Sequence, residues 1–236
     1  MKMLELFSGS GDMSKQFKKL GFDVFTIDNN NDFENHTDLI VDIMSITADQ
    51  IIEKFGKPDI IWASPPCTAF SVASMGHHWT GGKGAYIPKT DFAKFSIELL
   101  KHLLKLIDEL QPELYFIENP RGVMRKMDCM KPLSRYTITY CQYGDNRMKP
   151  TDIWTNHIHP NFKPVCKNND SCHVSAPRGS STGTQGLKGN YERSLIPHEF
   201  CEYVAKISLD YMNKNIDLKG YQINIFDKEI GGIRNE

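Results

Sequence analysis

The stretch MLELFSGSGD, residues 3–12, combines three patterns that together indicate a fold class. Residues 3–7 form a short apolar run of the kind that builds a buried strand. Serine and glycine follow, and Met13, Phe17 and Leu20 then recur at helical spacing. A strand, a glycine-rich loop and a helix in this order begin a strand–helix–strand unit.

The rest of the chain continues this alternation. Further strands are predicted at 23–28, 39–43, 59–63, 114–119, 135–143 and 152–156, and helices at about 46–55, at 91–110 and from Pro197 to about Asn213. This order predicts an α/β fold with a doubly wound, mainly parallel sheet. Because such sheets bind ligands beyond the carboxyl ends of their strands, functional residues are expected there.

The composition is that of an ordinary globular protein. The chain has 236 residues with a formal net charge of −1, so any nucleic-acid surface is expected to be a local basic patch. Six cysteines are too few for a disulfide scaffold at this length, and no apolar run approaches a membrane span. We therefore expect a reduced protein in the cytoplasm, with no membrane partner.

Small and acidic residues follow the predicted strand ends. FSGSG, residues 7–11, opens a helix as a nucleotide loop does, although Ser14 replaces the third glycine of the dinucleotide signature. Asp28 is placed to hydrogen-bond ribose hydroxyls, and Asp42 to accept from an adenine amino group. Each acid alone is explained equally well as a helix cap or a solvated turn. Together with the loop they indicate an adenosine-bearing ligand without a pyrophosphate.

Cys67 and Glu118 follow two neighbouring strands. Pro65 and Pro66 restrict the backbone immediately before Cys67. A lone cysteine is more often a buried structural residue, but a nucleophilic thiol needs such fixed placement, so the double proline favours catalysis. Glu118 ends an apolar strand, where partial desolvation raises the pKa of a carboxyl group and suits proton donation. The alternative for Glu118 is a glutamate in solvent at the end of a strand.

These motifs resemble those of the cytosine-C5 DNA methyltransferases, in family order from residue 5 to about 200. ELFSGSG resembles the first S-adenosylmethionine loop, SPPC the nucleophile motif and ENP the family's ENV. YGDNRMK, residues 143–149, is similar to the segment that ends in R-x-R, and GNYERSLIP, residues 189–197, to the terminal motif that helps close the cofactor pocket. The resemblance implies a Rossmann-like class I methyltransferase that uses S-adenosyl-L-methionine and acts on duplex DNA with a flipped cytosine.

The resemblance also implies roles for individual residues. Cys67 would attack C6 of cytosine, Glu118 would hold and protonate N3, and Arg147 would position the thiolate or the carbonyl oxygen of the base. The implied cofactor-binding residues are Phe7, Ser8, Gly9, Gly11, Asp28, Asp42, Ile43 and Pro65, and the implied substrate-binding residues are Asn119 and Lys149. Residues 70–90, which are rich in glycine, are expected to form a mobile lid.

Some features depart from the family pattern. Proline in ENP is expected to alter the backbone at Asn119, and Lys149 in place of the second arginine loses a bidentate contact.

The predicted domains are 1–156 for catalysis and cofactor binding, 157–186 as a reduced target-recognition insert, 187–214 completing the catalytic domain, and 215–236 as a tail. So small an insert predicts short or relaxed specificity, or a partner that supplies it. The compact size suits a phage or mobile-element enzyme.

Two alternatives stay open at this point. The same motifs occur in a tRNA cytosine methyltransferase, so RNA is a possible substrate class. A catalytically silent nucleic-acid binder is the other alternative, and the intact Cys67 and Glu118 argue against it.

The insert also contains residue types that bind metals. Cys166, Cys172 and His173 lie close together, with His157 and His159 upstream. Cysteine and histidine ligate zinc, but the C-x5-C-H spacing matches no standard finger, and adjacent ligands are awkward. We therefore expect these residues to be scattered in a polar loop, and the sequence leaves a metal unassigned.

Overall fold

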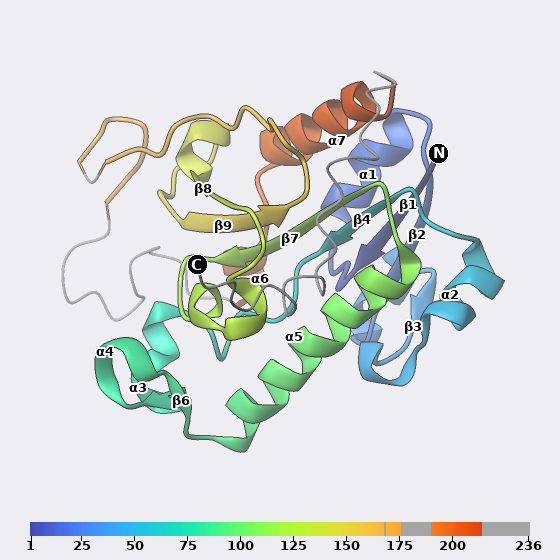
Figure 1. Cartoon of the computed structure of the whole chain (residues 1–236). Helices are drawn as coiled ribbons and strands as arrows, with labels where there is room; N and C mark the ends of the chain where they lie inside the picture. Colours follow the sequence, from blue (N-terminus) through green and yellow to red (C-terminus); the bar gives the residue numbers. More distant parts are fainter. Residues whose placement is uncertain (168, 176–189, 214–236) are drawn as a thin grey trace, which may run out of the picture.

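The structure is a computed structural model, and it describes residues 1–167, 169–175 and 190–213 (Figure 1). Its main sheet has seven strands in the order β3-β2-β1-β4-β7-β9-β8. The strands are β1 (Lys2–Leu6), β2 (Asp23–Asp28), β3 (Leu39–Ile40), β4 (Ile60–Ala63), β7 (Leu114–Pro120), β8 (Arg135–Thr139) and β9 (Pro150–Thr155). Strands β3, β2, β1, β4 and β7 run parallel, whereas β9 and β8 pair antiparallel at one edge. The predicted fold class is confirmed.

Helices cover both faces of this sheet (Figure 1). Helices α1 (Asp12–Lys19) and α7 (His198–Asn213) lie on one face, and α2 (Ala48–Phe55) and α5 (Asp91–Leu110) lie on the other. The sequence of strand β4 reflects this burial on both faces. Ile60 and Trp62 pack beneath α1 and α7, whereas Ile61 and Ala63 pack beneath α2 and α5. Because both faces are buried, the strand is apolar throughout, as parallel strands generally are.

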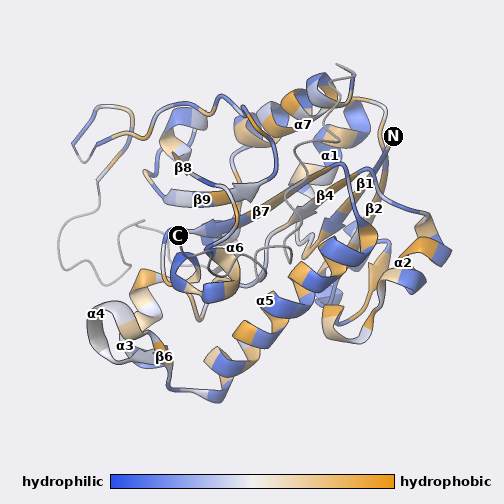
Figure 2. Ribbon diagram, viewed as in Figure 1, coloured by the Kyte–Doolittle hydropathy of each residue, from blue (hydrophilic) through white to orange (hydrophobic). Residues whose placement is uncertain are grey.

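Side chains that precede helices α5 and α2 cap the first turns of these helices. The Thr90 hydroxyl accepts from the Ala93 N–H at the start of α5, and Thr47 and Gln50 form a capping box at the start of α2. Figure 2 shows the alternation of hydrophobic and hydrophilic residues along α5, whose buried stripe includes Leu103 and Ile107. Capping and amphipathic spacing together explain why these two helices were predictable.

Two predicted strands are shorter than expected. The segment 39–43 forms only β3, because Asp42 accepts from the Met44 N–H and caps the 3-10 turn η2 (Ile43–Ser45). The segment 135–143 forms β8 and then the 3-10 turn η6 (Tyr140–Tyr143), which ends at Gly144 with φ 82°. A side-chain hydrogen bond at Asp42 and the left-handed conformation of Gly144 therefore accompany strands that end earlier than the sequence pattern predicts.

The segment 70–90 has more local structure than the predicted lid. Its elements are η3 (Val72–Ser74), α3 (Met75–His78), β5 (Trp79–Thr80), α4 (Gly82–Ala85) and β6 (Ile87–Pro88). The Trp79 indole N–H donates to the Ala69 carbonyl at 2.6 Å, and its ring packs against Phe70. These contacts anchor the segment just beyond Cys67.

No helix in the described ranges is both long enough and apolar enough to cross a membrane. Only parts of the predicted 157–186 insert lie within those ranges, and the predicted 215–236 tail lies outside them. The predicted domain boundaries therefore stay predictions.

Candidate active site

A cleft of about 260 Å³ opens at the carboxyl ends of the parallel strands. The loop after β1, the end of β2, the loop after β4 and the end of β7 all contribute to it. The predicted site residues that line this cleft are Phe7, Ser8, Gly9, Asp28, Pro65, Cys67, Glu118 and Lys149. Parallel topology therefore brings together residues as distant in sequence as Phe7 and Glu118, and Lys149 joins them from the position before the antiparallel strand β9.

Asp28 holds the glycine-rich loop beside β2. One carboxylate oxygen accepts from the Gly9 N–H at 2.8 Å, and the other accepts from the Asn30 N–H at 2.9 Å. Phe7 and Gly9 have positive φ angles of 58° and 50°, so the loop turns sharply as it leaves the strand. The turn leaves backbone and the Asp28 carboxylate along one wall of the cleft.

Glu5 also lines the cleft, although the sequence analysis did not select it. It is buried in β1 and accepts from the Ser14 N–H at 2.9 Å, at the start of α1. Burial raises the pKa of its carboxyl group to about 8, in spite of the opposing hydrogen bond from Ser14. The signal in sequence is an acid inside the otherwise apolar run MLELF.

Glu5→Gln is expected to change the pH dependence of stability. The folded chain keeps a proton on Glu5 up to about pH 8, whereas the unfolded chain loses it near pH 4.5. Since the unfolded state binds fewer protons in this window, Glu5 makes the free energy of unfolding fall as pH rises, by up to about 1.4 kcal/mol per pH unit. Urea denaturation from pH 5 to 8 should show a shallower fall for Glu5→Gln. Parallel curves for the two proteins would refute the raised pKa.

Contacts from the end of β7 and from the residues that follow it fix the loop that carries Cys67. The Asn119 side-chain amide donates to the Pro65 carbonyl at 2.8 Å. Gly122 approaches the loop so closely that a Cβ atom there would lie 2.1 Å from the Phe70 carbonyl oxygen. The Cys67 carbonyl in turn accepts from the Phe70 N–H at 2.9 Å. Prolines inside the loop and the ENPRG backbone beside it thus set the position of Cys67 together.

The electrostatics of the cleft centre on three groups. Burial raises the pKa of the Cys67 thiol, Glu118 raises it further, and Lys149 opposes both effects. Burial also raises the pKa of Glu118, against the opposing influence of Lys149 and of a hydrogen bond at 3.0 Å from the Tyr140 hydroxyl. Burial lowers the pKa of Lys149, and Glu118 opposes that shift. A carboxyl group with a raised pKa, a thiol with a raised pKa and a lysine with a lowered pKa therefore lie in the same cleft.

The structure places Arg147 and Lys149 differently from the sequence prediction. The Arg147 guanidinium binds Asp145 and donates to the Glu192 carbonyl at 2.8 Å, and Arg147 is outside the cleft lining. Lys149 is 5% exposed, lies over the Tyr140 ring and donates to the Arg193 carbonyl at 2.7 Å. Lys149 and, to a smaller extent, Arg193 are thus the cations whose charge lowers the pKa of Cys67, and the predicted role of Arg147 in positioning the thiolate stays a prediction.

Some other predicted site residues also lie outside the cleft lining. They are Gly11, Asp42, Ile43 and Asn119. Asp42 caps η2 and Ile43 is buried in the core, and the predicted adenine contact of this pair stays a prediction. Gly11, with φ 67°, is the N-cap of α1. For Asp42 the structure shows the helix cap that the sequence had left as an alternative.

Apolar side chains from distant segments complete the cleft. Phe33 lies in the 3-10 turn η1 (Asn31–His36), and Tyr191 in the short helix α6 (Asn190–Ser194). Their rings are nearly parallel, with an interplanar angle of 29° and centroids 6.3 Å apart. Leu195 and Ile196 follow on the same side. GNYERSLIP thus reaches the cleft, but Phe33 carried no recognisable pattern in sequence.

Comparison with known proteins identifies a family. The family model for C-5 cytosine-specific DNA methylases matches residues 1–133. The chain is 30% identical over 210 residues to a probable DNA (cytosine-5)-methyltransferase of Frog virus 3 (isolate Goorha), across 82% of this chain and 92% of that protein. It is 25% identical over 137 residues to the type II methyltransferase M.FnuDI of Fusobacterium nucleatum, across 53% of this chain and 34% of that protein.

One of the similar solved structures is a putative DNA modification methyltransferase encoded within an E. coli prophage, with a TM-score of 0.49 and 20% identity. That likeness covers 66% of this chain and 46% of the solved chain. The frog virus relative, by contrast, is matched over nearly its whole length. Because the family model covers more than half of the sequence and this relative covers most of it, the chain belongs to the C-5 cytosine-specific DNA methylase family and is a methyltransferase of the DNA (cytosine-5) class.

Proposed function

We propose that this chain methylates C5 of a cytosine flipped out of duplex DNA, with Cys67 as the nucleophile and S-adenosylmethionine as the methyl donor. The observation that carries the proposal is one cleft that is lined by Cys67, Glu118, Lys149 and residues 7–10 of the glycine-rich loop. Membership of the family supplies the reaction class, methyl transfer to cytosine in DNA. The cleft supports the assignment of residues to steps.

The cleft offers the groups that an adenosine-bearing methyl donor needs. When bound, S-adenosylmethionine supplies an electrophilic methyl group. The Gly9 backbone permits close approach, and the Asp28 carboxylate keeps lone pairs that can accept from ribose hydroxyls. The ring faces of Phe33 and Tyr191 suit an adenine ring. These residues therefore favour a donor site at the β1 and β2 end of the cleft.

The proposed reaction uses Cys67 and Glu118 in turn. The Cys67 sulfur bonds to C6 of cytosine while Glu118 gives its proton to N3, so electron density moves to C5. C5 would then take the methyl group as the methyl–sulfur bond of the donor breaks and leaves a neutral thioether, and the C5 proton would pass to water. The C6–S bond breaks as the C5–C6 double bond forms again, and N3 returns its proton to Glu118. The raised pKa of Glu118 supports its role as the acid, and the charge of Lys149 supports thiolate formation.

The substrate and its setting follow from this chemistry. Glu118 is 6% exposed, so a cytosine reaches it only after leaving the base stack.

We assign residues 157–186 to target recognition, residues 1–156 and 187–214 to catalysis, and residues 215–236 to a tail. Lys163 in the insert donates to the Gln142 carbonyl at 2.7 Å, which limits its reach to phosphates. A bacterial or phage-infected cytoplasm, where DNA is accessible, is the proposed location.

Asp28→Ala is expected to weaken binding of S-adenosylmethionine by about 1–3 kcal/mol, because a partly buried ribose contact is lost. Isothermal titration calorimetry measures the change directly. Asp49→Ala is the matched control, since Asp49 is an exposed acid on α2 outside the cleft lining and should leave the affinity unchanged. Equal affinities for wild type and Asp28→Ala would remove Asp28 from the donor site.

Side-by-side methyl transfer to duplex DNA and to tRNA tests the proposed function. With radiolabelled S-adenosylmethionine, we expect label in DNA cytosine and none in tRNA. Bisulfite sequencing of DNA from cells that express the chain then gives the sequence context. Label in tRNA alone would support the RNA alternative, and binding of the donor without transfer to either substrate would support the silent binder.

A further inference from the structure

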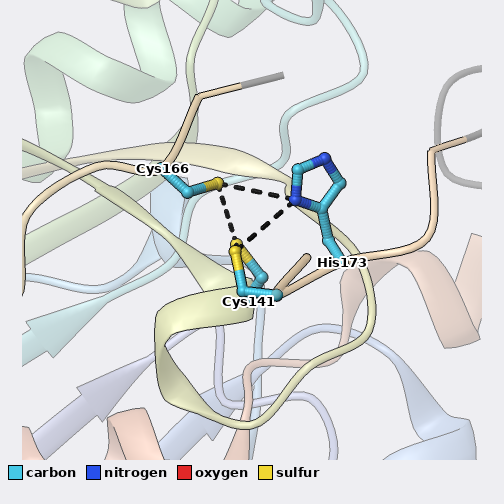
Figure 3. A group of neighbouring side chains, drawn as sticks. Cys141, Cys166 and His173 are labelled. Atoms are coloured by element: carbon cyan, nitrogen blue, oxygen red, sulfur yellow. Dashed lines mark hydrogen bonds between the residues drawn. The ribbon is translucent and has the colours of Figure 1, made fainter. Parts of the chain in front are cut away.

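Three cysteines and one histidine converge on a common point outside the catalytic cleft. Figure 3 shows the side chains of Cys141, from η6, and of Cys166 and His173, from the insert, directed toward one another. Cys172 completes the group. The three sulfur atoms and the imidazole nitrogen all lie within 4.8 Å of one another.

The separations match the edges of a small tetrahedron. The Cys172 sulfur lies 3.6 Å from that of Cys141, and the Nδ1 atom of His173 lies 3.6 Å from the sulfur of Cys172 and 3.7 Å from that of Cys166. Zinc bonds of about 2.3 Å to sulfur and about 2.0–2.1 Å to nitrogen place tetrahedral ligands about 3.6–3.8 Å apart. These three distances thus agree with a zinc-sized centre.

The Cys141 and Cys166 sulfur atoms are closer, at 3.0 Å. A disulfide has a sulfur–sulfur bond of about 2.05 Å, so the two atoms are not bonded, and all the cysteines are free thiols. Bringing these sulfurs from 3.0 Å to a tetrahedral edge of about 3.8 Å needs only a small shift of each side chain. Separations in the group reach up to 4.8 Å, and the longest of them would also have to shorten for all four atoms to bind one ion.

We propose that Cys141, Cys166, Cys172 and His173 bind one Zn²⁺ ion as a structural site. Three thiolates and an imidazole are the soft and borderline ligands that select zinc. Four protein ligands fill a tetrahedral sphere and leave no open position for water or substrate, which separates a structural site from a catalytic one. Cys141 and Cys166 are buried, so the ion would lie between the insert and the body of the domain.

The sequence prediction is corrected on this point. Cys166, Cys172 and His173 were expected in a scattered polar loop, because their spacing matches no standard finger. The missing ligand, Cys141, precedes Cys166 by 25 residues and lies outside the predicted insert. Folding therefore supplies a ligand that local spacing could not reveal, while His157 and His159 are not among the four.

The site would fasten the insert to a segment beside the catalytic cleft. The Cys166 N–H donates to the Thr139 hydroxyl at 3.0 Å, and the Val174 N–H donates to the Asn146 carbonyl at 2.8 Å. Tyr140, which hydrogen-bonds to Glu118, directly precedes the ligand Cys141. Loss of the ion should therefore loosen the insert, and with it DNA recognition, before it affects binding of the methyl donor.

Metal analysis of the purified full chain tests the proposal. We expect about one zinc per chain, and Co²⁺ in its place should give the visible spectrum of tetrahedral, thiolate-bound cobalt. His173→Ala should lower the zinc content well below one per chain, whereas His173→Cys should retain the ion through a fourth thiolate. Cys129→Ser, at a free cysteine outside the cluster, is the control and should keep full zinc content.

Three results would overturn the proposal. One is wild-type protein that holds neither zinc nor tetrahedral cobalt after incubation with either ion. The second is equal zinc content in wild type and His173→Ala. The third is a Cys141–Cys166 disulfide in the native protein, found by mass spectrometry of unreduced peptides. Since the wild-type cobalt spectrum requires no variant to fold and no methyl transfer, it tests the site independently of the proposed function.

Discussion

Cys67→Ser is expected to reduce methyl transfer by on the order of 10⁴-fold or more, because the covalent step is lost. A serine hydroxyl has a far higher pKa than a thiol, and Glu118 must keep its proton for N3 in the proposed mechanism, so it is not available as a general base for the serine. The substitution changes one atom, so the fold and the affinity for the methyl donor should hold. Single-turnover transfer of a radiolabelled methyl group to duplex DNA measures the loss.

Cys129→Ser is the matched control for that measurement, because Cys129 is also a partly exposed free cysteine but lies outside the cleft lining. It should retain wild-type activity. Transfer by Cys67→Ser within tenfold of wild type would contradict the proposed nucleophile.

Glu118→Gln is expected to lower the rate of methyl transfer by about 10²–10⁴-fold, the usual contribution of general acid catalysis. Glutamine keeps an oxygen that can accept from Tyr140, so packing should survive, but it has no proton to transfer to N3. Affinity for the methyl donor should be nearly unchanged. Glu98→Gln, on the exposed face of α5, is the control and should have wild-type activity.

The pH profile separates loss of the acid from general damage to the cleft. Activity requires protonated Glu118 and the Cys67 thiolate, so the wild-type rate should rise with pH as the thiol ionises and fall at high pH as Glu118 loses its proton. In Glu118→Gln only the thiol titrates, so the falling limb should disappear. In this variant the rising limb should extend above the ordinary range of a cysteine, because burial raises the pKa of Cys67. An unchanged falling limb in the variant would assign the acid to another group.

The sheet was predictable from sequence because its strands are buried on both faces. Continuous apolar runs such as the one at 60–63 indicate such strands. Amphipathic spacing and an N-terminal capping residue indicate helices such as α5. Where a side chain hydrogen-bonds to the neighbouring backbone, the apolar pattern predicts a longer strand than the structure has. The segment 39–43 was predicted as one strand, but the strand ends early where Asp42 caps a turn.

The candidate site was predictable only where its residues end strands. Cys67, Glu118 and Asp28 follow β-patterns directly, and parallel strands must bring such positions to one edge. Lys149 and Arg147 are two positions apart in a loop, and sequence could not show which of them turns inward. Glu5, Phe33 and Cys141 depend on packing between distant segments, which no local pattern records.

The covalent bond between Cys67 and the target base is the most direct test of the proposed mechanism. Duplex DNA with 5-fluorocytosine at the methylated position should trap the enzyme once the methyl group has been transferred, because fluorine does not leave C5 as a proton does. In the presence of S-adenosylmethionine, we expect a complex that survives denaturing electrophoresis and maps by mass spectrometry to Cys67. An adduct that persists in Cys67→Ser or maps to another cysteine, or methylation of ordinary DNA without any trapped complex, would contradict it.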